Sequence, residues 1–220
     1  MKISALKSLA VVALATAPLL AAAQLSANVS LNSSYKFRGQ DQTANKPALQ
    51  GGFDYAHGSG AYVGIWNSNV TWLPGNSLET DIYGGYKGEV AGVGYDVGFL
   101  RYMYPGAGVA NTNEIYAGVS FAGFGAKYYR TVSDQYFGGS KAGYLALSYS
   151  MEVAKGVTAS VGVGFTDFKN GTDYTDYSVG LGYDIGDGYS VKAALVGANK
   201  KAVYGDINKN RLVLTFAKAM

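Results

Sequence analysis

Few side chains in this sequence are of the kinds that enzymes and metal sites use. His57 is the single histidine, cysteine is absent, and two acidic pairs stand out, Glu79 with Asp81 and Asp176 with Asp184. A lone histidine in a predicted glycine-rich turn lacks the partners of a hydrolytic site and the companion ligands of a zinc site. Acidic residues that share one strand face more often give that surface a negative charge than perform general acid–base catalysis or bind calcium. We therefore predict that the protein is not an enzyme and holds no metal or cofactor.

The glycine-rich runs and the basic residues do not indicate nucleotide or nucleic-acid binding. The glycines at 92–94 and 162–164 alternate with valine, and no helix is predicted after them or after 84–85, so no helix N-terminus is available for a phosphate. Glycine at such positions is typical of curved barrel strands. The chain has 18 Lys and Arg against 15 Asp and Glu, without a clustered basic stretch. We predict no nucleic-acid partner.

Residues 1–23 have the three parts of a secretory signal peptide. Lys2 and Lys7 form the basic start, residues 9–20 are almost all apolar, and Ala21 and Ala23 give the small-residue pattern of a cleavage site before Gln24. The apolar run is short for a membrane-spanning helix, which makes an uncleaved anchor the less favoured alternative. We expect residues 1–23 to be a signal peptide and residues 24–220 to form the exported domain.

The exported part alternates apolar and polar residues with the period of two that indicates β-strands with two unlike faces. In residues 29–39 the odd positions are mostly apolar and the even positions are all polar. The clearest case is 176–185, where serine, glycine and aspartate alternate with Tyr177, Val179, Leu181, Tyr183 and Ile185. A face of glycine and small hydroxyls cannot fill a protein core, but it suits the wall of a water-filled lumen. The apolar face is then expected to contact lipid.

The predicted connections between these strands alternate in length. The longer ones are 40–46, 73–78, 105–112, 133–141, 168–175 and 199–209; the shorter ones are 57–60, 87–92, 122–124, 154–156 and 186–188. Bacterial outer-membrane barrels have even strand numbers, short periplasmic turns and longer outer loops. We therefore predict an all-β fold, a closed antiparallel transmembrane β-barrel of about 12 strands. Short turns and both termini are expected in the periplasm, with longer loops outside.

Several unusual stretches occur in an order that resembles a known family. They are Tyr35-Lys-Phe-Arg-Gly39, the runs 46–57 and 64–70, Glu79-Thr-Asp-Ile-Tyr-Gly-Gly-Tyr86, and Tyr95-Asp-Val-Gly98 followed by Tyr104-Pro-Gly106. On these stretches the chain resembles the TorF porin family of proteobacteria over nearly its whole exported length. The resemblance implies an outer-membrane barrel; it names no substrate and supplies no site residues.

The polar strand faces supply the residues that we expect to line a pore. The candidates are Lys36, Arg38, Asp54, Asn67, Asn69, Glu79, Asp81, Asp96, Glu114, Lys127 and Lys192. Charges of both signs on the inner wall predict weak ion selectivity. Inward Tyr83, Tyr116 and Tyr129 are expected to fill one side of the lumen, while the glycine wall leaves the other side open. Arg101 and Arg130 share faces with apolar residues, so we expect them either to reach the outer membrane interface or to mark a bulge.

These patterns predict a bacterial outer-membrane channel for passive diffusion of small solutes or ions. The alternative from another class is a non-conducting barrel that binds a partner or lipopolysaccharide through its loops. The expected partners are outer-membrane lipid, lipopolysaccharide, the barrel-assembly machinery and the solutes or ions themselves. The chain ends on Met220 instead of the aromatic residue usual in such barrels, and Phe216 is the candidate to replace it.

Overall fold

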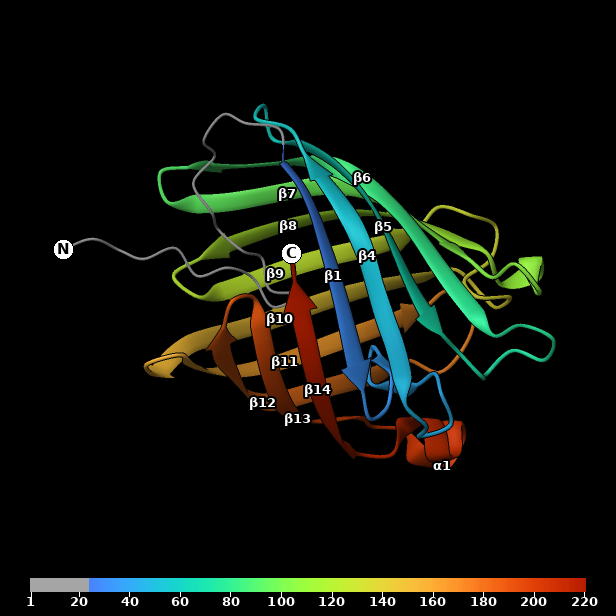
Figure 1. Ribbon diagram of the computed structural model, residues 1–220. Coiled ribbons are helices and arrows are strands. Elements are labelled where there is room, and N and C mark those ends of the chain that lie inside the picture. The colour runs from blue at the N-terminus through green and yellow to red at the C-terminus, as the bar shows by residue number, and fades with distance from the viewer. Residues whose placement is uncertain (1–23) are drawn as a thin grey trace.

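Twelve long strands form one closed antiparallel barrel in the computed structural model, which describes residues 24–220 (Figure 1). They are β1 (Gln24–Asn32), β4 (Ala48–Ala56), β5 (Ala61–Asn69), β6 (Leu78–Val90), β7 (Val93–Met103), β8 (Thr112–Phe121), β9 (Phe124–Thr131), β10 (Ala142–Ala154), β11 (Val157–Phe168), β12 (Tyr174–Gly186), β13 (Tyr189–Ala198) and β14 (Arg211–Ala219). The predicted all-β, closed antiparallel barrel of about 12 strands is confirmed. The predicted signal peptide, residues 1–23, lies outside the described residues.

Shorter elements lie within the connections at one end of the barrel. β2 (Lys36–Phe37) and β3 (Gln40–Asp41) pair with each other, η1 (Gly108–Ala110) precedes β8, and α1 (Lys201–Tyr204) and η2 (Gly205–Asn208) precede β14. Figure 1 shows α1 at the lower right, where β14 begins. Within residues 24–220, no helix is long and apolar enough to cross a membrane.

The connections alternate in length as predicted. Longer connections follow β1, β5, β7, β9, β11 and β13, and tight turns follow β4, β6, β8, β10 and β12. Three tight turns have positive φ at both central residues, namely Ala91 with Gly92, Ala122 with Gly123, and Asp187 with Gly188. This geometry matches the right-handed twist of the flanking strands. We call the end with the longer connections the outer end, because the tight turns of such barrels face the periplasm.

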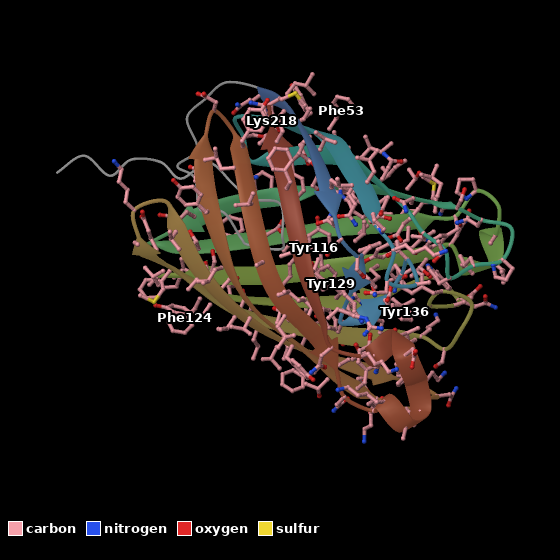
Figure 2. The ribbon with its side chains drawn as sticks, turned by 60° about the horizontal axis from the view of Figure 1, so that its bottom comes forward. Phe53, Tyr116, Phe124, Tyr129, Tyr136 and Lys218 are labelled. Atoms are coloured by element: carbon pink, nitrogen blue, oxygen red, sulfur yellow. The ribbon has the colours of Figure 1, made fainter. Side chains whose placement is uncertain are left out.

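The strands turn apolar side chains outward and small or polar side chains toward the lumen. On β12, Val179 and Leu181 are 52% and 55% exposed, whereas Gly180 between them is buried. Figure 2 shows Phe53 and Phe124 on the outside of the barrel, and Phe53 is 59% exposed. A continuous outward apolar surface of this kind is typical of a wall whose solvent is lipid.

The first strand ends earlier than its sequence pattern predicts. β1 stops at Asn32. Residues 33–47, here called the inner loop, leave the wall, and the part from Tyr35 to Thr43 folds into the lumen. Arg38 and Gly39 in this loop have positive φ angles of 46° and 76°. An extended strand does not allow such angles. The prediction of a continuous strand over 29–39 is therefore wrong.

The aromatic residues of the inner loop pack inside the barrel. Tyr35 lies edge-to-face against Trp66 of β5, with ring centroids 5.7 Å apart, and Phe37 lies in the same way against Tyr102 of β7 at 5.6 Å. Both partners are on inward strand faces. Apolar residues that fill a lumen alternate in sequence like residues that face lipid, which explains the wrong prediction.

The barrel closes at a short seam between β1 and β14. Residues 28–32 pair with residues 215–219. Two backbone hydrogen bonds between Ala27 and Met220, of 3.0 and 2.8 Å, extend this seam. The backbone of Met220 therefore takes part in closing the barrel.

Candidate functional site: the barrel lumen

A buried ion pair fastens the inner loop to the barrel wall. The Arg38 guanidinium donates two hydrogen bonds to the Glu114 carboxylate of β8, Nη1 to Oε1 at 3.0 Å and Nη2 to Oε2 at 2.7 Å. The two side chains are 5% and 1% exposed. Tyr102 donates to Glu114 Oε2 at 3.1 Å, and Arg38 Nη1 also donates to the Tyr136 hydroxyl at 3.1 Å. Bidentate pairs of this kind combine strength with a fixed geometry.

Four aromatic rings surround the Arg38 guanidinium. Its Cζ lies 4.2 Å from the ring centroid of Tyr144, 4.8 Å from Phe37, 5.0 Å from Tyr129 and 5.7 Å from Tyr136. Cation–π attraction is stronger where water is excluded. Burial opposes the charge, but the Glu114 carboxylate outweighs it and raises the pKa of Arg38 well above its ordinary value. The guanidinium is therefore a permanent charge that holds the loop.

An apolar cluster fills the outer mouth of the lumen on the β5–β8 side. Its buried centre is Val70, Tyr102, Tyr104 and Ala110, and partly buried residues packed on it are Tyr35, Phe37, Trp72, Leu73, Leu100, Ala107 and Phe137. Phe137 comes from the connection between β9 and β10. Its ring lies within 6.2 Å, centroid to centroid, of the rings of Phe37, Trp72, Tyr102 and Tyr104. The inner loop and three other connections therefore meet over this half of the lumen.

Two carboxylates of β6 lie close to this cluster, and neither forms an ion pair with a basic residue in the described part of the chain. Glu79 is 2% and Asp81 8% exposed, and the Tyr35 hydroxyl donates to Glu79 Oε1 at 3.2 Å. Glu79 Oε2 and Asp81 Oδ1 have no hydrogen-bond partner among the described residues. A buried carboxylate without donors is costly in its charged form. In the part of the chain that the structure describes, no group of three or more His, Cys, Asp or Glu could hold a metal.

Tyrosines and charged side chains also fill the lumen on the β5–β9 side further from the outer mouth. The Tyr62 hydroxyl donates to Asp96 Oδ1 at 2.5 Å and lies 2.6 Å from the Tyr116 hydroxyl. Lys127 Nζ donates to Asp96 Oδ2 at 2.7 Å and lies 3.9 Å from the Tyr116 ring centroid. Figure 2 shows Tyr116 and Tyr129 within the barrel. The prediction that inward tyrosines occupy one side agrees with this arrangement.

Small and polar side chains line the opposite half of the lumen, on β10–β14, β1 and β4. The inward residues of β11 and β12 include Ser160, Gly162, Gly164, Ser178, Gly180 and Gly182. Asn32 Nδ2 donates to Gln50 Oε1 at 2.9 Å, and Thr215 Oγ1 donates to Asn32 Oδ1 at 2.6 Å, which makes a polar belt across three strands. Lys192 of β13 pairs in register with Thr215 and forms no ion pair with any described carboxylate.

The structure groups most of the predicted lumen residues. Arg38 binds Glu114, Asp96 binds Lys127, and Glu79 and Asp81 lie side by side on the inward face of β6. Asp54 of β4 accepts a hydrogen bond of 2.5 Å from the Tyr83 hydroxyl. Lys192 stands apart on the small-residue wall. Their role in conduction stays a prediction.

Asn67 and Asn69 lie on the outer face of β5, so their prediction as lumen residues is wrong. They share the face of Ile65, which is 36% exposed. Asn67 Oδ1 accepts a hydrogen bond from the Thr80 hydroxyl at 2.7 Å, and Asn69 Oδ1 accepts one from the Leu49 backbone N–H at 2.7 Å. Both residues lie near the outer end of the strand, where polar residues of barrels can also point outward.

Lys36 does not lie on a strand of the wall, in contrast to the prediction. Its Nζ donates to the backbone oxygens of Ile207 at 2.8 Å, Lys209 at 2.9 Å and Gly39 at 3.3 Å. These bonds connect the inner loop to the segment between β13 and β14. Burial lowers the pKa of Lys36 to about 8, and the nearby charge of Arg211 acts in the same direction.

Sequence reasoning missed Tyr136, Phe137 and Tyr144 as parts of the site. Tyr136 and Phe137 lie in a connection, where no periodicity indicates which way a side chain points. The only signal is an aromatic pair inside an otherwise polar and glycine-rich stretch. Phe137 has a positive φ of 49°, which turns its ring into the cluster.

Comparison with known proteins places this barrel in a family. Residues 16–219 match a family described as bacterial protein of unknown function (Gcw_chp). The chain belongs to this family. No curated protein matches the sequence.

Solved porin structures have a similar fold. The KdgM porin superposes with a TM-score of 0.60 at 10% identity, covering 88% of this chain and 98% of that chain. The NanC porin superposes with a TM-score of 0.61 at 9% identity, covering 89% and 98%. KdgM in complex with disordered oligogalacturonate gives 0.58 at 8% identity, covering 89% and 95%. Identities this low show a shared fold alone.

Proposed function

We propose that the protein is a porin-like channel of the bacterial outer membrane, through which small solutes or ions diffuse passively. The observation that carries this proposal is the two-sided lumen. Aromatic and charged side chains fill the β5–β9 half, whereas glycine, serine and threonine line much of the β10–β14 half. Short side chains leave space for hydrated solutes next to the wall. The similarity to two porins of the same fold supports the proposal.

The inner loop crosses this path at the outer end. It is anchored on β8 through Arg38, and its Gly39 lies against the far wall. A Cβ atom at Gly39 would come within 2.5 Å of Asp176 Cβ on β12 and 2.7 Å of the Gly197 backbone oxygen on β13. The loop therefore reaches across the barrel, and solutes would pass beside it.

The charges along this path favour neither ion strongly. Lys192 of β13 and Arg211 of β14 are inward cations on the open half, and neither forms an ion pair with a described carboxylate, whereas Asp176 of β12 is an anion on the same half. Pores with both signs of charge on their walls discriminate weakly between anions and cations. We expect small polar solutes of either charge to pass.

Planar-bilayer recording of the refolded protein tests the proposal. Reproducible conductance steps are expected from a barrel whose mobility on denaturing gels changes with heating, which shows that it is folded. A folded barrel that stays silent would contradict the channel. It would favour the non-conducting barrel that binds a partner or lipopolysaccharide through its loops.

The outer-membrane location carries further proposals. Residues 1–23 would be removed as a signal peptide, the apolar wall would contact outer-membrane lipid and lipopolysaccharide, and the barrel-assembly machinery would insert the chain. The last strand, β14, presents Phe216 outward, 49% exposed, close to the end that such machinery reads. Membership of the TorF porins and the lack of catalysis belong to the same proposal. Cell fractionation with N-terminal sequencing tests it, since a mature outer-membrane protein starting at Gln24 is expected.

A further inference from the structure

Two arginines lie on the outward face of the barrel close to its outer end. Arg101 is two residues before the end of β7, and Arg130 is one residue before the end of β9. Asn113 of β8 lies between them, since it pairs with Arg101, while Ile115 on the same strand pairs with Arg130. The strands β7, β8 and β9 are neighbours in Figure 1. We call Arg101, Asn113 and Arg130 the outer basic patch.

The arginines of this patch have no acidic partner among the described residues. Neither Arg101 nor Arg130 forms an ion pair with a carboxylate anywhere in residues 24–220. The hydrogen bond that Arg101 makes is to the amide oxygen of Asn113, from Nη1 to Oδ1 at 3.2 Å. The two strands that carry the arginines are separated by two inter-strand spacings, about 10 Å. Long arginine side chains at this separation can bind one polyanionic group together.

Lipid-facing residues continue directly from the patch toward the middle of the barrel. Phe99, Ile115 and Tyr128 are 43%, 49% and 46% exposed on the same outward faces. A cation on this face is costly in hydrocarbon, by about 2–4 kcal/mol at the midplane and little near the interface. The patch therefore fits the level where acyl chains end and lipid headgroups begin. Since no carboxylate within residues 24–220 supplies a counter-charge, the headgroups would supply it.

We propose that the outer basic patch binds the phosphate groups of lipopolysaccharide, while Phe99, Ile115 and Tyr128 contact its acyl chains. Guanidinium groups bind phosphate in a bidentate manner, and a second guanidinium on the other side of Asn113 suits a ligand with more than one phosphate. The two cations match the phosphate groups of a phosphorylated, acylated glycolipid, and the exposed apolar surface beside them matches its acyl chains. The proposal rests on the proposed outer-membrane location, but it does not depend on conduction.

The test compares lipid retention by a double variant and a matched control. Arg101→Gln with Arg130→Gln removes both charges, and Lys155→Gln with Lys218→Gln removes two basic charges at the opposite end. Refolded proteins are titrated with purified lipopolysaccharide and with the same lipid after phosphatase treatment, and the bound fraction is measured by native mass spectrometry. We expect the patch variant to bind intact lipopolysaccharide at least about tenfold more weakly than wild type, because two charged hydrogen-bond donors are lost. The control should bind like wild type.

Several results would overturn the proposal. They are equal affinity of wild type and the patch variant, an equal loss in the control, binding that does not depend on the phosphates, or equal retention of phosphatidylglycerol. Heat-dependent gel mobility shows whether each variant folds, and bilayer recording of the same samples separates the two proposals. A silent barrel that still requires Arg101 and Arg130 for lipopolysaccharide contradicts the channel and supports the patch. A conducting barrel whose lipopolysaccharide binding does not require Arg101 and Arg130 supports the channel and contradicts the patch.

Discussion

Replacing Glu114 by glutamine tests whether the buried ion pair holds the inner loop across the lumen. The substitution keeps the size of the side chain and removes its charge. Because Arg38 and Glu114 are 5% and 1% exposed, the variant leaves a guanidinium buried without its counter-charge. Breaking a buried pair by removing one partner costs about 3–5 kcal/mol. We expect a loss of about 3 kcal/mol, at the lower end of that range, since glutamine still accepts a hydrogen bond and the aromatic rings around Arg38 remain.

Two readouts follow this loss. Trp66 contacts Tyr35 of the inner loop and Trp72 contacts Tyr104 of the cluster, and they are the only tryptophans of the chain, so urea unfolding monitored by tryptophan fluorescence reports on this region. Single-channel conductance should increase as the loop is released. Asp206→Asn is the control, because it breaks the exposed pair with Lys209 and should change neither readout. Wild-type unfolding and conductance in Glu114→Gln would refute the proposed role of the pair.

Three further predictions concern the lumen and the inner loop. Phe137→Ala removes the ring that contacts Phe37, Trp72, Tyr102 and Tyr104. Conductance should rise, and the free energy of unfolding should fall by about 3 kcal/mol. An unchanged conductance would place the cluster away from the solute path. Lys192→Glu should shift the reversal potential in a salt gradient toward cations, whereas Asn67→Asp on the outer face should not; equal shifts would contradict the assigned faces. Lys36 has a folded pKa lowered to about 8. The unfolded chain therefore binds more protons above that pH, and the free energy of unfolding should rise between about pH 8 and about pH 10. Urea titrations across this range should show a smaller rise in Lys36→Met, and an equal rise would assign the effect to another group.

The wall of the barrel could be predicted from the sequence because each strand carries its own signal. In β12, Val179 and Leu181 alternate with glycine. A barrel wall with an apolar outer face and a polar inner face imposes that period along the whole strand. The alternation of long and short connections then fixed the number of strands. Both features are local, so one sequence is sufficient to recognise them.

The interior of the lumen could not be predicted in the same way. Arg38 and Glu114 are 76 residues apart, and no local pattern connects them. Tyr35 and Phe37 continue the period of β1, yet they pack on aromatic rings inside the barrel instead of on lipid. Asn67 is polar and faces outward, where its amide oxygen accepts a hydrogen bond from Thr80 of the neighbouring strand. Polar residues can point outward near the ends of barrel strands. Polarity alone does not separate these environments.

Single-channel recording of the refolded wild-type protein tests the central proposal most directly. A path along the small-residue wall predicts small, reproducible conductance steps with weak ion selectivity, and a larger step in Glu114→Gln. Silence from wild type and from Glu114→Gln, in barrels that are folded by their heat-dependent gel mobility, would contradict the channel and leave a closed barrel.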